Sequence, residues 1–174
     1  MKNRKRNRML RYDYSQNNLY FVTICVQDRK CCFGNVNTVG TGRDLSVLSV
    51  HESMNPYMEL NECGSIAEKQ LNWLANQYAY VVLHSFIVML NHVHAVLEID
   101  SNLISDCEIK IKSLSELIGA YKTTSSKQIH LAGFTGFTWQ RSFHDHIIRN
   151  GGSYERISNY IETNPEKWNT DVFF

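Results

Sequence analysis

Residues 81–99 read VVLHSFIVMLNHVHAVLEI, which is two apolar runs separated only by Leu90 and Asn91. Each run is rich in β-branched and aromatic residues, and this composition with so short a join predicts two strands, 81–89 and 92–99. Side chains alternate between the two faces of a strand. One face of the second strand is therefore apolar and is expected to lie under helices: Val93, Ala95, Leu97 and Ile99.

The segments on either side supply the other elements of a sheet. Residues 19–26, LYFVTICV, predict a first strand. Residues 34–56 hold several glycines and small polar residues, which indicates a long surface excursion or a hairpin that closes near residues 57–60. Residues 100–112 are expected to form a loop, and residues 137–149 predict a fourth strand.

Three helices are predicted from capping signals and apolar periodicity. Ser65 and Glu68 have capping-box spacing, as do Ser113 and Glu116. Each pair precedes an apolar stripe at helical spacing: Ala67, Leu71, Leu74, Ala75 and Tyr78 in one, and Leu114, Leu117, Ile118 and Tyr121 in the other. A last helix is expected to begin at Ser153 and to end at Pro165.

The resulting order is β-α-β-β-α-β followed by a helix, which predicts an α+β, ferredoxin-like (split βαβ) fold. Its antiparallel sheet would carry two helices on one face. The other face would stay open to a ligand or to the extra C-terminal helix. Residues 15–174 are expected to form one domain, preceded by a basic arm at residues 1–14.

Composition narrows the class of protein. The chain has 174 residues, with 43% hydrophobic and 20% charged, which suits one globular domain. No run approaches the about 20 apolar residues that a membrane span needs. The five cysteines are odd in number and lack C-x-x-C spacing, which favours free thiols over disulfides or a zinc cage. We therefore expect a cytoplasmic protein.

The charges are distributed unevenly. No acidic residue precedes Asp13, and residues 1–11 hold six basic residues: Lys2, Arg4, Lys5, Arg6, Arg8 and Arg11. Removing these six charges from the net charge of +1 leaves −5 on the rest of the chain. Such an arm suits contact with nucleic-acid phosphates. The same run is also typical of a solvated chain terminus.

Two H-x-H motifs occur in the predicted strands. His92 and His94 project together from the exposed face of their strand, and paired imidazoles of this kind can bind one metal ion. Val93 between them suits a buried opposite face. The second motif, His144-Asp145-His146, has an acidic centre, so neither of its faces is plainly apolar. Its histidines are expected to support the metal ligands, to contact DNA or to be simple polar strand residues.

The last predicted helix carries Tyr160 and Asn164 at i and i+4. Side chains at this spacing can reach the same point, so the Asn164 amide can complete a His–His–Asn metal site beside the Tyr160 hydroxyl. An alternative is that Tyr160 is a half-buried core residue and Asn164 a helix stop before Pro165.

Six blocks in order carry a family resemblance across residues 12–168: YDYSQNNLYFVTICVQDRKCCFG, MELNECG, MLNHVHAVLEI, SLSELIGAYKT, WQRSFHDHIIRN and ISNYIETNPEKW. The chain resembles the single-tyrosine HUH transposases, and within them the REP-associated tyrosine transposases. One departure is Leu90, where the family usually has proline before the Asn-His pair.

The resemblance implies a metal-dependent tyrosine DNA nuclease and strand transferase that cleaves and rejoins single-stranded hairpin DNA. It implies His92, His94 and Asn164 as ligands of Mg²⁺ or Mn²⁺, and Tyr160 as the nucleophile that forms a 5′-phosphotyrosine and frees a 3′-hydroxyl. A homodimer and a monomer both stay open. The basic residues expected to bind DNA are Arg4, Lys5, Arg6, Arg8 and Arg11.

The main alternative is a non-catalytic or domesticated nucleic-acid-binding protein on the same fold. Such a protein would stack bases on aromatic residues of the open sheet face. Tyr20, Trp139 and Phe143 are the candidates for that role.

Overall fold

The computed structural model describes residues 9, 11–37, 56–105 and 109–170. Its strands are β1 (Asn18–Cys25), β2 (Gly34–Asn37), β3 (Tyr57–Leu60), β4 (Val81–Val88), β5 (His92–Ile99) and β6 (His144–Ile148). Its α-helices are α1 (Glu62–Gln77), α2 (Leu114–Leu131) and α3 (Gly151–Glu162). Three short 3₁₀-helices complete the order: η1 (Gln27–Arg29), η2 (Ser101–Leu103) and η3 (Asn164–Thr170).

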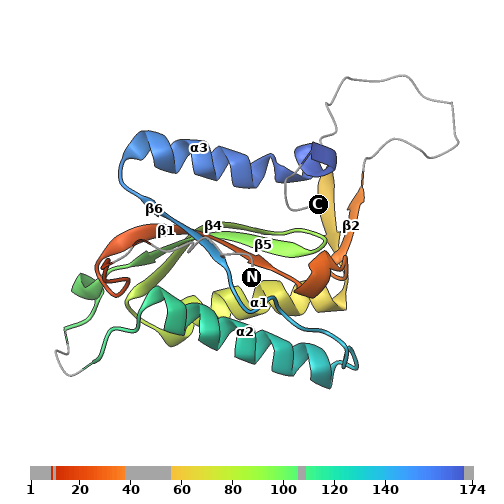
Figure 1. The fold of residues 1–174 in the computed structure, drawn as a ribbon, viewed down its shortest axis with the longest axis horizontal. Helices are drawn as coiled ribbons and strands as arrows, with labels where there is room; N and C mark the ends of the chain where they lie inside the picture. Colours follow the sequence, from red (N-terminus) through yellow and green to blue (C-terminus); the bar gives the residue numbers. More distant parts are fainter. Residues whose placement is uncertain (1–8, 10, 38–55, 106–108, 171–174) are drawn as a thin grey trace, which may run out of the picture.

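Four strands form one antiparallel sheet in the order β4-β5-β1-β6, and β2 pairs with β3 in a separate two-stranded sheet. Helices α1 and α2 lie side by side on one face of the large sheet, and α3 lies on the opposite face (Figure 1). This is the split βαβ arrangement, so the predicted α+β fold is confirmed.

The main core lies between the sheet and the α1–α2 layer. The predicted apolar face of β5 is fully buried there, together with Leu71 and Leu74 from α1 and Leu117 and Ile118 from α2. A smaller apolar cluster lies on the other face, where Val96 and Ile148 of the sheet contact Ile161 of α3. Both faces of the sheet are therefore covered, and α3 is held by its own apolar contacts.

The first helix is capped by Asn61, which precedes Ser65 by one turn. The side-chain oxygen of Asn61 accepts a hydrogen bond from the backbone N–H of Gly64 at 3.0 Å. The prediction of a Ser65–Glu68 capping box is therefore wrong, because the N–H of Ser65 already donates to the Asn61 carbonyl inside the helix. The second capping box is confirmed, since Ser113 and Glu116 cap each other reciprocally at the start of α2.

The fourth strand is much shorter than residues 137–149. Lys122 of α2 donates from Nζ to the carbonyl oxygens of Gln140, Arg141 and Ser142 at 2.8, 3.4 and 3.1 Å. A side-chain amine thus binds carbonyls that a strand ladder would otherwise use, and regular pairing begins only at His144. The long-range lysine contact is the physical reason for the difference.

The boundaries of the last helix also differ from the prediction. Asn150 caps α3 by accepting from the N–H of Ser153 at 2.8 Å, and the helix ends at Glu162. Pro165 then lies in the first turn of η3, where its missing N–H costs nothing.

Three further expectations concern loops and cysteines. The predicted loop 100–112 contains η2 where it is described, and β2 and β3 form the hairpin expected from residues 34–60, although residues 38–55 lie outside the described residues. The four described cysteines form no disulfide with one another, whereas Cys107 lies outside the described residues.

The capping role of Asn61 can be tested directly. Asn61→Ala removes the cap and the 3.0 Å hydrogen bond from Asn61 to the Cys32 carbonyl, so it should lower the free energy of unfolding by about 1–2 kcal/mol. Ser65→Ala should change it by less than about 0.5 kcal/mol. Urea unfolding of both variants checks this. A larger loss of unfolding free energy in Ser65→Ala than in Asn61→Ala would contradict the assignment of Asn61 as the cap.

Candidate active site

The two histidines of β5 converge on the face covered by α3. Their Nε2 atoms lie 3.0 Å apart, and both side chains are 0% exposed. The predicted shared face is confirmed, but the expectation that these histidines are exposed is wrong. Helix α3 and η3 cover this face of the sheet, so the imidazoles lie in a site from which bulk water is largely excluded (Figure 1).

Each imidazole is oriented by a buried polar neighbour. The Nδ1 atom of His92 lies 2.7 Å from the side-chain oxygen of Asn91, and Nδ1 of His94 lies 2.9 Å from the hydroxyl of Thr23 on β1. Because an amide oxygen only accepts, Nδ1 of His92 carries the hydrogen. When the His92 ring is neutral, its Nε2 atom therefore presents a lone pair to the site.

The electrostatic environment favours neutral imidazole at His94. Burial lowers its pKa well below the usual range, and the neighbouring His92 lowers that pKa further. His94 is consequently uncharged near neutral pH. A neutral imidazole is the form that can bind a metal ion.

Tyr160 reaches the same point from α3. Its hydroxyl lies 3.3 Å from Nε2 of His94, and its ring lies edge-on to Phe21 of β1 with centroids 6.2 Å apart. Tyr121 is placed quite differently: it is fully buried under the other face, donates to the Ala67 carbonyl at 3.1 Å, and burial raises its pKa. Of these two helix-borne tyrosines, only Tyr160 meets the histidines.

The 3₁₀-helix η3 brings two further residues to this end of the sheet. The Trp168 ring stacks on His92 with centroids 6.2 Å apart and an interplanar angle of 20°. Asn164, at the start of η3, is fully buried. The segment that carries Asn164 thus packs directly against the paired histidines through Trp168.

The spacing of the two imidazoles suits a divalent ion. Within residues 9, 11–37, 56–105 and 109–170, no group of three or more His, Cys, Asp or Glu side chains is placed to hold a metal. Two imidazole nitrogens 3.0 Å apart nevertheless match neighbouring corners of an octahedron. With bonds of about 2.1 Å, such corners lie about 3.0 Å apart. The spacing of the paired histidines therefore fits two neighbouring ligand positions of a divalent ion.

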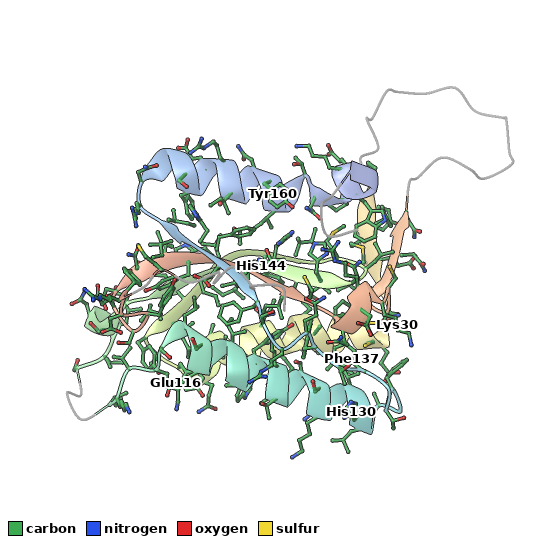
Figure 2. The ribbon with its side chains drawn as sticks, in the orientation of Figure 1. Lys30, Glu116, His130, Phe137, His144 and Tyr160 are labelled. Carbon is green, nitrogen blue, oxygen red and sulfur yellow. The ribbon has the colours of Figure 1, made fainter. Side chains whose placement is uncertain are left out.

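The second H-x-H motif flanks the first. In the sheet, Thr23 pairs with His94 on one side and with His144 on the other, and Phe21 pairs with His146. His144 and His146 are exposed and leave β6 on the face that Ile148 shares with α3. In Figure 2, His144 lies on β6 beneath Tyr160 of α3. Both motifs thus belong to one face of the sheet.

Other predicted binding residues are not brought to this site. Tyr20, Trp139 and Phe143 are 0, 9 and 8% exposed and belong to the main core, so their proposed role in stacking bases on an open face is wrong. Arg11 is exposed and has a backbone φ of 65°. Arg4, Lys5, Arg6 and Arg8 lie outside the described residues.

Sequence patterns missed the residues that orient the histidines. Thr23 is the one polar residue in the run FVTIC, and that interruption is a usable signal for a functional position. Trp168 follows the last predicted helix and gave no periodic signal. Its contact with His92 depends on how η3 folds back over β5.

The lowered pKa of His94 predicts acid sensitivity. An unfolded histidine titrates near pH 6.5. Below about that pH the unfolded chain binds one more proton than the folded protein, so stability should fall by up to about 1.4 kcal/mol per pH unit. Urea unfolding in EDTA from about pH 7 to about pH 5 checks this. His94→Gln should flatten the slope, and an equal slope in both proteins would contradict the assignment.

No helix in the described part of the chain is long and apolar enough to cross a membrane.

No protein-family model matches the chain. An uncharacterized protein of Haemophilus influenzae is 26% identical over 189 aligned residues, covering 98% of this chain and 93% of that protein. A putative transposase from Deinococcus radiodurans gives a TM-score of 0.49 at 15% identity over 89% of this chain and 95% of that one.

A solved REP-associated tyrosine transposase, bound to a REP hairpin, superimposes with a TM-score of 0.58 at 17% identity. The match covers 92% of this chain and 73% of that one. The fold of this chain is therefore that of a REP-associated tyrosine transposase.

Proposed function

We propose that the protein is a metal-dependent endonuclease and strand transferase that acts on single-stranded or hairpin DNA. The observation that carries the proposal is the position of the Tyr160 hydroxyl, 3.3 Å from Nε2 of His94, which itself lies 3.0 Å from Nε2 of His92. A nucleophile beside two convergent imidazoles is more than a core tyrosine or a base-stacking surface requires. The transposase fold supports the same function.

Tyr160 is the group that reacts in this proposal. The Tyr160 hydroxyl gives up its proton as its oxygen attacks phosphorus, and the bond from phosphorus to the 3′-oxygen breaks. The 3′-oxygen leaves with the electron pair and takes up a proton, so one proton is released and one is gained. The 5′-phosphate stays on Tyr160. Because the phosphotyrosine keeps a phosphodiester-like bond, a 3′-hydroxyl can attack it in reverse and rejoin the strand without an added energy source.

His92, His94 and Asn164 would hold the divalent ion, Mg²⁺ or Mn²⁺. Such an ion supplies Lewis-acid polarisation of the phosphate and stabilises the charge that develops on its oxygens. Three neutral ligands leave the double charge of the ion uncompensated, which strengthens its attraction for phosphate. Thr23 and Asn91 are positioning residues, because they fix the ring orientation of the two histidines.

The surroundings of Tyr160 suit a reaction that is shielded from bulk water. Its side chain is half-buried between α3 and the sheet, next to Phe21 and His94. A partly dry site strengthens the electrostatic interactions on which catalysis depends. The structural neighbour is bound to a REP hairpin, and this supports DNA as the partner of the present protein. A hairpin with a single-stranded extension is therefore the first substrate to test.

The nucleophile can be identified by covalent trapping. Tyr160→Phe removes only the hydroxyl, so it should bind a labelled hairpin with a single-stranded extension normally but form no denaturant-stable adduct in Mn²⁺. Tyr121→Phe should retain adduct formation. Peptide mapping of the wild-type adduct should find the nucleotide on the fragment containing Tyr160. An adduct with Tyr160→Phe would overturn the proposal.

The metal site has its own test, which does not depend on cleavage. His92→Gln and His94→Gln should abolish Mn²⁺ binding measured by electron paramagnetic resonance, and both should lose adduct formation. Thr23→Val, which keeps the side-chain shape but removes the hydrogen bond to His94, should weaken Mn²⁺ binding by about 10–100-fold. His130→Gln, on α2 at the other face of the sheet, is the control and should bind Mn²⁺ like the wild type. Unchanged Mn²⁺ affinity in both His92→Gln and His94→Gln would show that the metal binds elsewhere.

A further inference from the structure

A groove of about 450 Å³ lies where the start of α3 meets the edge strand β6. It is separate from the paired histidines. Six of its lining residues matter for its chemistry: Met9, Asp145, His146, Arg149, Ser153 and Arg156. Asp145 and His146 alternate along β6 and leave it on opposite faces. The groove therefore wraps around the open edge of the sheet.

The groove carries a surplus of positive charge. Arg149 and Arg156 are exposed, and neither forms an ion pair with a carboxylate among the described residues. Arg149 contacts the Met9 sulfur at 3.6 Å, and Nε of Arg156 donates to the Gly152 carbonyl at 3.1 Å, which turns its guanidinium towards the start of the helix. Among the described residues that line the groove, Asp145 is the one acidic residue. Both guanidinium groups keep most of their donors for a ligand.

The groove is connected to the proposed nucleophile in two ways. Arg156 and Tyr160 are i and i+4 on α3, so they share one side of the helix and are separated by a rise of about 6 Å. His146 pairs across the sheet with Phe21, whose ring contacts Tyr160. A strand that has its phosphate at Tyr160 can therefore continue into this groove.

We propose that this groove binds the sugar–phosphate backbone of the DNA strand adjacent to the cleaved phosphate, with Arg149 and Arg156 as the phosphate contacts. The inference rests on the proposed function, because it takes the strand's direction from Tyr160. Guanidinium groups suit this role through their planar, bidentate donors.

The test measures DNA affinity against salt in a Tyr160→Phe background, where no covalent step interferes. The probe is a fluorescent hairpin with a 5′ single-stranded extension. Arg149→Gln and Arg156→Gln should each weaken binding by about tenfold. The slope of log affinity against log salt should become shallower by about 0.7 for each phosphate that the variant no longer neutralises.

The matched control removes the same charge from the far side of the molecule. Lys69 of α1 and Lys127 of α2 are exposed on the helices that cover the other face of the sheet. The double variant Lys69→Gln/Lys127→Gln should leave the salt slope unchanged, whereas Arg149→Gln/Arg156→Gln should reduce it. Equal reductions of the salt slope in the two double variants would show a general effect of charge and would overturn the assignment of the groove to DNA. Thermal unfolding verifies that both double variants are folded.

Two further readouts separate the possible failures. If wild-type protein forms the Tyr160 adduct but the arginine variants keep the wild-type salt dependence of DNA affinity, the assignment of the groove to DNA is wrong and the proposed function is unaffected. If the arginine variants reduce the salt dependence but wild-type protein forms no adduct, DNA binding in the groove is supported and Tyr160 is not the nucleophile. Calorimetry with inorganic phosphate addresses a free anion as ligand: tight phosphate binding that the arginine variants abolish, with DNA affinity unchanged, would overturn the assignment to DNA.

Discussion

The alternation of side chains along β5 is the constraint on which the rest of the molecule depends. This strand lies inside the sheet between β4 and β1, and nearly all of its residues are buried. Val93, Ala95 and Leu97 pack under α1 and α2, while His92 and His94 face α3. A slip of one residue in register would place imidazoles in the apolar core and isoleucine and valine in the polar site. The same packing that stabilises the fold therefore fixes the histidines in space.

Burying two imidazoles has a cost that the neighbouring strand offsets. Polar groups removed from water need hydrogen-bond partners, and the register of β1 against β5 places Thr23 directly opposite His94. The turn before β5 supplies Asn91 for His92. The two rings are thus held by backbone pairing and by the start of the strand, not by flexible loops. Rigid placement of this kind is what a site with two convergent nitrogens needs.

Periodicity in the sequence predicted the order of strands and helices, because each main element buries one continuous apolar face. It failed where a contact between distant residues decides the outcome. Lys122 binds the carbonyls of residues 140–142 and shortens the fourth strand. Asn61, which caps the first helix in place of Ser65, is also bonded to the Cys32 carbonyl 29 positions away. The positions of His92, His94 and Tyr160 followed from spacing and resemblance, whereas the burial of the histidines did not. That burial depends on how α3 and η3 pack, which no local pattern encodes. Arg156 likewise has an ordinary helical position in the sequence, and its place in the groove comes from the meeting of α3 with β6.

The contact between Tyr160 and His94 joins residues that are 66 positions apart, and it crosses between two layers of the molecule. A chain made from its N-terminus completes β1 and β5 well before α3 is available to dock. During synthesis the imidazoles therefore face water, and the Tyr160 hydroxyl is still absent. Contacts of such long sequence separation form late, because closing a large loop costs chain entropy before the contact repays it. On the proposed function, a partly made chain would therefore hold paired histidines with no nucleophile beside them.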